Sequence, residues 1–202
     1  KFDIIKYKEK GVILMKQIGV FVARTQPLHN GHIHIINQAL DECSQVYVFV
    51  GSADKLNFRN PLPINLRMEI IEETYKSEIE QGILVINPLD DLSHEGDHSY
   101  SWGTYIFANM IKVSGISVFR MYYSDGWEII TSWFEPYLLR NNVSLTLTAR
   151  GSVLAGLCAT DMRKLILEGR FKEVKNSVPY STYKRLPLIQ QFLDIQEKMK
   201  VN

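Results

Sequence analysis

The segment that most constrains the fold lies near the start of the chain, where an apolar run gives way to a helical pattern within a few residues. Residues 18–23 are apolar and partly β-branched, which predicts a first strand over Gln17 to Ala23. Residues 35–40 repeat their apolar positions at helical spacing, which predicts a helix from about Asn30 to Glu42. A strand that turns directly into a helix is typical of an alternating α/β chain.

Two histidines, His29 and His32, lie three residues apart at this junction. Gly31 stands between them, where a side chain would block the close approach of a ligand to the backbone. A helix N-terminus presents unpaired N–H groups and a partial positive charge, so it suits an anion. Two imidazoles aimed at the same point therefore predict a site that handles phosphate.

The stretch from Gln26 to His34 resembles the HxGH signature of the nucleotidyltransferase superfamily. Residues 24–28 narrow the likeness, since they resemble the GRFQPFH segment of the archaeal-type nicotinamide-nucleotide adenylyltransferases, a resemblance that covers most of the chain from about residue 16 to 179. Two positions depart from that segment: Ala23 stands where the family has glycine, and Thr25 where it has phenylalanine. Alanine holds this turn only if φ is negative at position 23.

Zinc chemistry is a weaker interpretation of the histidines. On a helix, positions 32 and 34 point to different faces, so His34 is expected to be a surface or half-buried residue. A catalytic zinc site also usually recruits a carboxylate or a more distant ligand. His94 and His98 have the spacing of a helical metal pair, but they fall in a segment that we expect to be a loop.

The composition fits one α/β domain and sets limits on the partners. The chain has 202 residues, of which 46% are hydrophobic, enough for one sizeable core and a small appendage. With 23 basic and 22 acidic residues, the net charge of +1 gives no electrostatic case for nucleic acid or an anionic membrane as the main partner. Cys43 and Cys158 lie far apart, so a reducing, cytoplasmic setting is expected.

The two ends of the chain are expected to differ from the domain between them. Met15 stands just before the first strand, so residues 1–14 are expected to be a dispensable extension: an edge strand or arm, a cloning remnant or translated upstream sequence. They lack the pattern of a signal peptide, and no run approaches the length of a transmembrane helix. We place the main domain at 15–180 and a C-terminal amphipathic helix, kinked by Pro187, at 181–202.

The remaining chain alternates predicted strands and helices, which favours a Rossmann-like fold with a five-stranded parallel sheet flanked by helices. The run at 46–50 is apolar on both faces and indicates a buried strand, whereas the run at 143–148 alternates and indicates an edge strand. The other predicted elements are strands at 83–86 and 116–122 and helices at about 64–79, 99–113 and 127–140.

A small-residue turn, Gly51-Ser52-Ala53, follows the second predicted strand, at the sheet edge where ligands bind in open parallel sheets. The turn, the following Asn-Pro and the next helix start resemble the GSA, NPF-like and ER-type segments of the same family. Leu62 replaces the aromatic residue, and Leu66-Arg67 replaces Glu-Arg. The resemblance implies that Gly51, Ser52, Lys55 and Arg67 bind the acceptor; the alternative for the two basic residues is a solvated surface.

The polar loop at 88–98 is long for a compact domain, and such loops are usually functional or mobile. In the resembled family, a loop and an aromatic residue at this place hold the nicotinamide nucleotide. Trp102 is therefore the candidate for stacking on the pyridine ring, because a flat electron-poor ring prefers an aromatic face. The alternative is that Trp102 packs on the core. Asp125, in a turn that resembles the family's YSG turn, is expected to accept hydrogen bonds from ATP ribose hydroxyls, or else to cap a helix.

A second signature lies near residue 160. The stretch from Cys158 to Arg163 resembles the superfamily's second signature, the ISTxR or SGTxIR segment: Thr160 and Arg163 match it, while Cys158 and Ala159 replace serine and glycine. A helix N-terminus, a hydroxyl and a guanidinium group are expected to converge there on the outgoing phosphates.

The resemblance implies an adenylyltransferase, in which the phosphate of nicotinamide or nicotinate mononucleotide attacks ATP and pyrophosphate leaves. His29 and His32 would act on the α-phosphate and Arg163 on the β- and γ-phosphates; Arg24, Gln26, Gly31, Asp125 and Thr160 would complete the ATP site. Mg²⁺ would be held by phosphates and water rather than by protein ligands. Flavin mononucleotide, phosphopantetheine, a CTP-dependent reaction and a non-catalytic nucleotide sensor remain alternatives. The sequence is silent on oligomeric state, although many relatives assemble.

Overall fold

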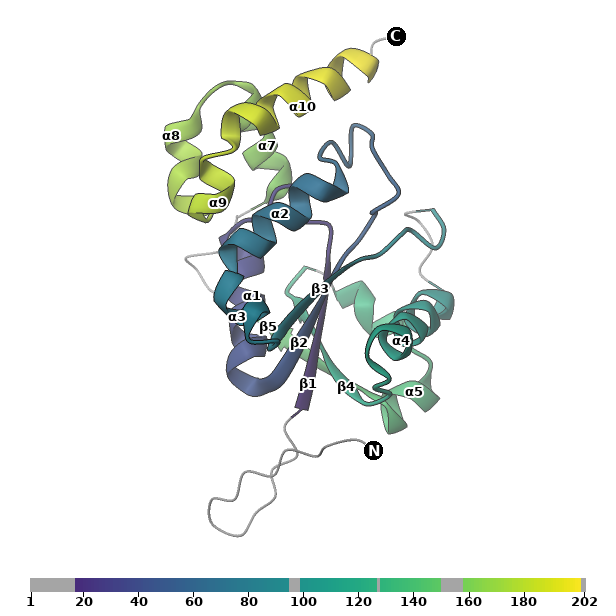
Figure 1. Ribbon diagram of the computed structural model, residues 1–202. Coiled ribbons are helices and arrows are strands. Elements are labelled where there is room, and N and C mark those ends of the chain that lie inside the picture. The colour runs from purple at the N-terminus through teal and green to yellow at the C-terminus, as the bar shows by residue number, and fades with distance from the viewer. Residues whose placement is uncertain (1–16, 95–98, 127, 150–157, 201–202) are drawn as a thin grey trace.

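The computed structural model describes residues 17–94, 99–126, 128–149 and 158–200. Five parallel strands form one sheet in the order β3-β2-β1-β4-β5 (Figure 1). The strands are β1 (Gln17–Ala23), β2 (Cys43–Val50), β3 (Leu84–Pro88), β4 (Phe119–Ser124) and β5 (Val143–Thr148). The predicted five-stranded parallel α/β fold is therefore confirmed, with β5 at an edge as expected.

The strand order determines where a ligand site can form. From β1 the chain proceeds outward through β2 to β3, then crosses back to β4 on the other side of β1. Loops leaving β1 and β4 therefore diverge, which opens a crevice beyond the carboxyl ends of these strands. The predicted phosphate segment follows β1 and lies at this crevice.

Helices cover both faces of the sheet (Figure 1). The longer ones are α1 (Asn30–Glu42), α2 (Ile64–Thr74), α4 (Tyr100–Ser114), α7 (Ala159–Leu167) and α10 (Leu186–Lys200). The short ones are α3 (Lys76–Glu80), α5 (Pro136–Asn141), α8 (Phe171–Val174), α9 (Tyr180–Tyr183) and the 3₁₀ turns η1 (Glu128–Ser132) and η2 (Lys175–Ser177). Helices α7 to α10 gather at one end of the molecule, beyond α2 (Figure 1).

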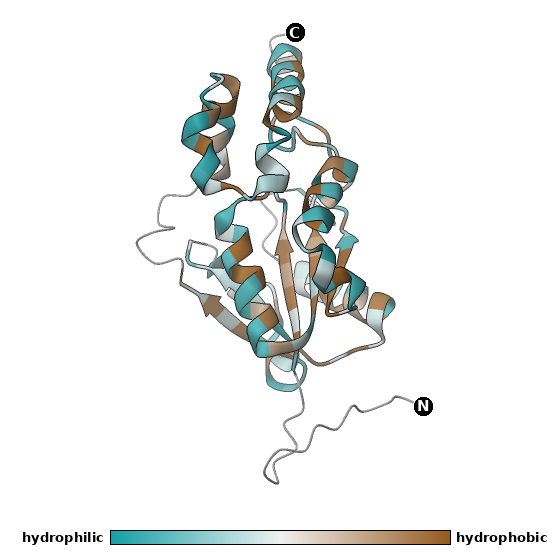
Figure 2. Cartoon of the chain, turned by 60° about the vertical axis from the view of Figure 1, so that its left-hand side comes forward, coloured by the Kyte–Doolittle hydropathy of each residue, from teal (hydrophilic) through white to brown (hydrophobic). Residues whose placement is uncertain are grey.

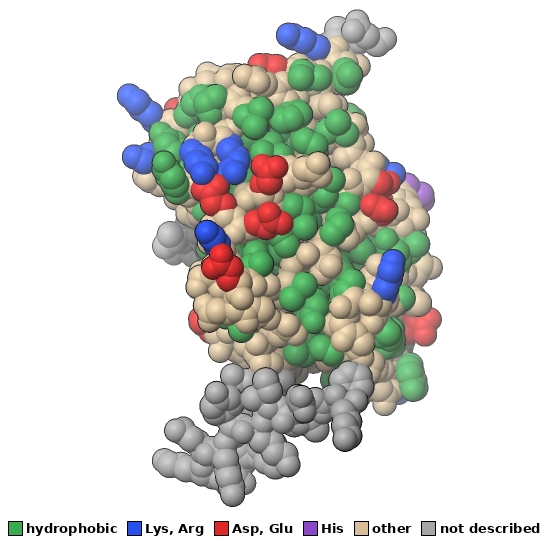
Figure 3. Space-filling view, in the orientation of Figure 1, with side chains coloured by type: hydrophobic (Ala, Val, Ile, Leu, Met, Phe, Trp, Pro, Cys, Tyr) green, Lys and Arg blue, Asp and Glu red, His purple; other side chains and the backbone are tan. Residues whose placement is uncertain are grey.

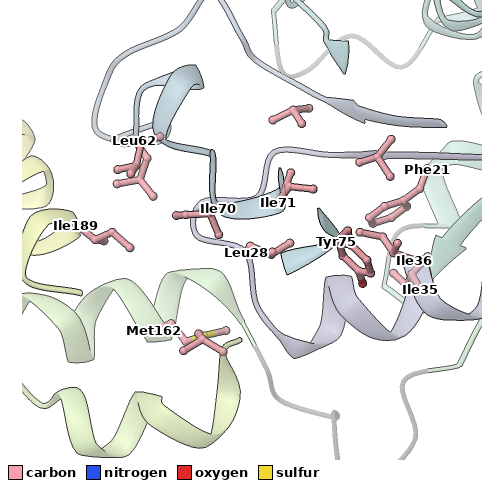
Figure 4. Packing of buried hydrophobic residues seen from close by; sticks show 14 of the residues in the cluster. Phe21, Leu28, Ile35, Ile36, Leu62, Ile70, Ile71, Tyr75, Met162 and Ile189 are labelled. Carbon is pink, nitrogen blue, oxygen red and sulfur yellow. The ribbon is translucent and has the colours of Figure 1, made fainter. Parts of the chain in front are cut away.

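Side-chain alternation along the strands divides the core in two. On β1, Phe21 belongs to a cluster of buried residues that also includes Ile35 of α1, Ile70 of α2 and Met162 of α7 (Figure 4). Its neighbour Val20 belongs to a second cluster of buried hydrophobic residues, which includes residues of α4 and η1. The strands are accordingly the most continuously apolar part of the chain, whereas the helices carry one apolar face (Figure 2).

The C-terminal helices are joined to the sheet through apolar and polar contacts. Leu186 and Ile189 are fully buried in the same cluster as β1 and β2. Thr74 Oγ1 of α2 and Ser181 Oγ of α9 lie 2.6 Å apart, and Arg185, between α9 and α10, pairs with Glu73 of α2 at 2.6 Å. Acidic and basic side chains are interleaved on the face drawn in Figure 3.

The division into a domain at 15–180 and a helix at 181–202 stays a proposal, and residues 1–14 lie outside the described residues.

Several predicted boundaries were wrong, and β2, for example, begins at Cys43 rather than at residue 46. The helix expected at 64–79 ends at Thr74, because Tyr75 leaves helical geometry, buries its ring and donates from its hydroxyl to Asn37 Oδ1 at 3.0 Å. The helix expected at 127–140 is instead η1 and α5, separated before Pro136, and the strand expected from 116 begins at Phe119. The C-terminal segment is two helices, and Pro187 is the second residue of α10, where proline fits the first turn instead of kinking the helix.

Gly103 allows α4 to lie against the segment after β4. A Cβ at this position would overlap the Trp133 carbonyl and lie 2.9 Å from Phe134 Cδ1. We expect Gly103→Ala to lower the free energy of unfolding by about 1–3 kcal/mol, the scale of an overpacked core, as measured by urea denaturation. Thr104→Ala, at the next and exposed position, is the control and should change stability little. Equal stability of the two variants would show that α4 does not need this close approach.

No helix in the described ranges is long and apolar enough to cross a membrane.

Candidate active site

A cavity of about 690 Å³ opens at the carboxyl ends of β1, β2 and β4 and at the N-termini of α1 and α7. Its volume lies within the range usual for small-molecule sites. The cavity brings together most of the predicted site residues, from segments as far apart as 24 and 163: Arg24, Gln26, His29, Gly31, His32, Gly51, Ser52, Trp102, Thr160 and Arg163. Lys55, Arg67 and Asp125 are not among its lining residues.

His29 and His32 form a reciprocal cap at the start of α1. The backbone N–H of Gly31 donates to His29 Nδ1 at 3.1 Å, and the backbone N–H of His29 donates to His32 Nδ1 at 3.3 Å. The two ring centroids lie 3.8 Å apart. Because both Nδ1 atoms accept hydrogen bonds, each neutral imidazole carries its proton on Nε2. The rings therefore line the cavity as two closely spaced N–H donors.

Two guanidinium groups add positive charge to the same wall. Burial lowers the pKa of Arg163, and the neighbouring Arg24 lowers it further. Burial also lowers the pKa of Arg24, although the Asp91 carboxylate opposes this shift. Arg163 is held in place by donating from Nη1 to the Gln26 carbonyl at 2.9 Å and from Nη2 to Thr160 Oγ1 at 3.2 Å. The mutual repulsion of the two cations favours an anion in the cavity.

Hydrogen bonds to two other segments of the chain hold the loop that carries His29 in place. The Gln26 amide accepts from the Leu62 N–H at 2.9 Å and donates to the Leu62 carbonyl at 3.3 Å. From α9, the Thr182 hydroxyl donates to the Leu28 carbonyl at 3.0 Å. Thr25, in the same loop, has a positive φ of 46°, whereas Ala23 is not among the residues with a positive φ. The left-handed residue of this turn is therefore Thr25, and Ala23 fits as the last residue of β1.

Two tryptophans also line the cavity. Trp102, from α4, lies against Trp133 with ring centroids 5.7 Å apart and an interplanar angle of 25°, and both residues line the cavity. Trp133 Nε1 is buried without a hydrogen-bond partner among the described residues. Trp133 was not predicted as a site residue, because the sequence around it gives no sign that its side chain lines a cavity rather than the protein surface. Its proximity to Trp102 arises only because the residues that follow η1 pack against α4 at Gly103.

Three predicted residues lie elsewhere. Lys55 pairs with Asp54 at 2.7 Å and lines a second hollow of about 580 Å³ that shares Asp91 with the main cavity. Asp125 is half-buried between Ser124 and Gly126, which do line the main cavity. Arg67 is 1% exposed, and all three of its hydrogen bonds go to backbone carbonyls. For Ser52, the hydroxyl donates to Asp91 Oδ1 at 2.9 Å.

Cys158 occupies the N-cap of α7, on the cavity wall. Burial acts to raise the pKa of its thiol, but the N–H groups of Thr160 and Asp161 bring it below its ordinary value.

The described residues contain no group of three histidine, cysteine, aspartate or glutamate side chains able to hold a metal ion. His34 lies exposed, with Nε2 3.2 Å from the Ala149 carbonyl, away from the pair formed by His29 and His32. His98 lies outside the described residues.

Comparison with known proteins places these features in context. The model of the cytidylyltransferase-like family matches residues 20–96. A nicotinamide-nucleotide adenylyltransferase of Thermococcus kodakarensis is 25% identical over 162 residues, which cover 77% of this chain and 75% of that protein. A nicotinamide/nicotinic acid mononucleotide adenylyltransferase of Acinetobacter baylyi is 24% identical over 186 residues, which cover 90% of this chain and 92% of that protein.

A solved structure is similar over most of the chain. It is a bifunctional NMN adenylyltransferase/ADP ribose pyrophosphatase from Francisella tularensis, complexed with AMP and a manganese ion. The TM-score is 0.67 at 21% sequence identity, and the match covers 93% of this chain. It covers 54% of the Francisella chain, so this chain spans about half the length of that protein. At this identity the likeness concerns the fold.

Proposed function

Because the chain belongs to the nucleotidyltransferase superfamily, we propose that it is an adenylyltransferase that moves AMP from ATP to the phosphate of nicotinamide or nicotinate mononucleotide. The products are pyrophosphate and a dinucleotide such as NAD. The observation that carries this proposal is the lining of the cavity, which combines two imidazole donors, two guanidinium groups and a pair of stacked tryptophans. The names of the relatives support the same reaction.

The chemistry needs alignment more than proton transfer. An oxygen of the acceptor phosphate, which is already ionised at pH 7, forms a bond to the α-phosphorus of ATP. The bond from that phosphorus to the α,β-bridging oxygen breaks, and its electron pair leaves with pyrophosphate. His29 and His32 donate to the α-phosphate and the bridging oxygen, where charge builds up. Arg163 and the start of α7, with Thr160, hold the β- and γ-phosphates.

Mg²⁺ fits this site as an ion bound to the substrate. The groups on the phosphate side are imidazoles, guanidinium groups and a hydroxyl, which do not form the oxygen cage that the ion would otherwise require. When bound to ATP, the ion supplies further neutralisation of phosphate charge. The protein's part is to orient the phosphates that carry it, through Arg24 and Arg163.

The test is a measurement of pyrophosphate release by the full chain with ATP, Mg²⁺ and one acceptor at a time. Release is expected with nicotinamide or nicotinate mononucleotide, and little with flavin mononucleotide or phosphopantetheine. Replacing ATP with CTP should abolish most of the release. ATP binding without release on any acceptor would favour a nucleotide sensor and overturn the proposal.

Trp102 provides a test of the acceptor end. If its ring stacks on the pyridine ring, Trp102→Ala should raise the KM for the mononucleotide about tenfold, because stacking on an aromatic side chain contributes roughly 1–3 kcal/mol. The KM for ATP should change little. Tyr100→Ala, an exposed aromatic residue in the first turn of the same helix, is the matched control. An unchanged KM for the mononucleotide would show that Trp102 does not stack on the acceptor and has only a structural role.

A cytoplasmic setting is part of the proposal, supported by the two free cysteines. Assembly into a homo-oligomer and the lack of a nucleic-acid partner stay predictions.

A further inference from the structure

Arg67 is the largest fully buried side chain of the described residues, and it carries a charge. Its Nη1 donates to the carbonyls of Arg24 at 2.9 Å and Gly51 at 2.7 Å, and its Nη2 donates to the Ser52 carbonyl at 3.0 Å. All three acceptors are backbone atoms, and Nε is buried without a partner among the described residues. Burial lowers the pKa of Arg67 to about 10, so the group remains charged at neutral pH.

The three carbonyls belong to two different loops. Arg24 follows β1, and Gly51 and Ser52 follow β2, so the guanidinium group joins the carboxyl ends of two adjacent strands. Both loops form cavity wall: Arg24, Thr25, Gly51 and Ser52 all line it. Arg67 itself does not, so its effect on a ligand must pass through these loops.

Both loops contain a residue in an unfavourable conformation. Thr25 has φ of 46° and Ser52 has φ of 50°, in the left-handed region that side chains other than glycine rarely adopt. For Thr25, which is β-branched, this is an outlier, and its buried Oγ1 has no hydrogen-bond partner among the described residues. Such a conformation persists only where the surroundings enforce it. The hydrogen bonds from Arg67 fall on Arg24, which precedes Thr25, and on Gly51 and Ser52.

We propose that Arg67 is a positioning residue, which holds the loops after β1 and β2 in their strained conformations and thereby fixes Arg24 and Ser52 for substrate binding. This proposal rests on the proposed function for the identity of the substrates, but the hydrogen bonds that join Arg67 to the two loops are contacts within this chain. It replaces the expectation that Arg67 touches the acceptor. The planar fork of a guanidinium group is suited to three acceptors in two loops, whereas a lysine ammonium is a compact point charge that serves them poorly.

The test compares ATP affinity, measured by calorimetry on the full chain, between the natural protein and Arg67→Lys. Misplacement of Arg24 should weaken ATP binding by about tenfold to a hundredfold, because small displacements of a binding group cost that much. ATP affinity needs no acceptor. If the natural chain binds ATP but fails to release pyrophosphate, the proposed reaction fails while the role of Arg67 is still tested.

A second pair of variants separates positioning from general stability. Glycine adopts a positive φ without steric cost, so Thr25→Gly makes the conformation of the loop after β1 less dependent on the hydrogen bonds from Arg67. We expect the loss of ATP affinity caused by Arg67→Lys to be about fivefold smaller in the Thr25→Gly background, in line with the strain of one left-handed residue. A purely structural role would lower the melting temperature by the same amount in both backgrounds and leave the ratio of affinities unchanged.

The outcomes divide clearly. A smaller loss in the glycine background supports the proposal, and so does a lysine variant that folds only with glycine at position 25. An equal loss in both backgrounds overturns it, as does natural ATP affinity in folded Arg67→Lys. If the lysine variant folds in neither background, Arg67→Gln is measured in the same cycle. Failure of that variant in both backgrounds assigns Arg67 to the fold alone and also overturns the proposal.

Discussion

Replacing His32 with alanine is expected to lower kcat about 10²- to 10³-fold, the scale for losing one preorganised donor in a transition state. The His32 ring lies 3.8 Å from the His29 ring, and its Nδ1 accepts the His29 N–H, which leaves Nε2 as the donor toward a ligand. Negative charge on the α,β-bridging oxygen grows as pyrophosphate leaves. Because this donor matters most at that moment, the KM for ATP should change much less than kcat.

His34→Ala is the matched control, since His34 lies two residues away on the same helix and is exposed. It should retain full turnover. Melting temperatures of both variants show whether loss of the His29–His32 cap destabilises α1. Near-natural turnover of His32→Ala at saturating ATP and Mg²⁺ would contradict the mechanism.

Elements with a strong local signal could be predicted from the sequence to the residue. Strand β1, helix α1 and strand β5 have the predicted bounds, because apolar periodicity and turn residues agree there. Where the prediction failed, local chemistry competed with periodicity. The residue before a proline disfavours helical geometry, which separates η1 from Pro136, and proline fits the first turn of a helix, which explains Pro187. Both signals are present in the sequence and outweigh the apolar periodicity there.

The residues of the candidate site likewise differ in whether the sequence alone could predict them. His29, His32, Thr160 and Arg163 could be predicted because they lie at two helix starts after strands, so the local pattern already indicates their common edge. Arg67 and Trp133 could not. A basic residue in the first turns of a helix usually lies at the surface, and the burial of Arg67 depends on carbonyls of two loops that only the folded sheet brings together.

Arg163→Ala is expected to lower kcat/KM for ATP about 10²- to 10³-fold, because each hydrogen bond from a charged group contributes roughly 1.5–3 kcal/mol. In contrast to His32, Arg163 holds phosphates that are bound in the ground state and in the transition state alike. Its loss should therefore raise the KM for ATP as well as lower kcat. Steady-state kinetics at varied ATP separate the two effects.

Two further variants make this test specific to the guanidinium group. Lys164→Ala, at the next and exposed position of α7, should leave both parameters unchanged. Arg163→Lys keeps the charge but loses the fork that reaches the Gln26 carbonyl and a phosphate together, so it should recover only part of the ATP affinity. A metal-dependent hydrolase would be indifferent to Arg163. An Arg163→Ala variant with natural KM for ATP would therefore show that the β- and γ-phosphates do not lie at the start of α7.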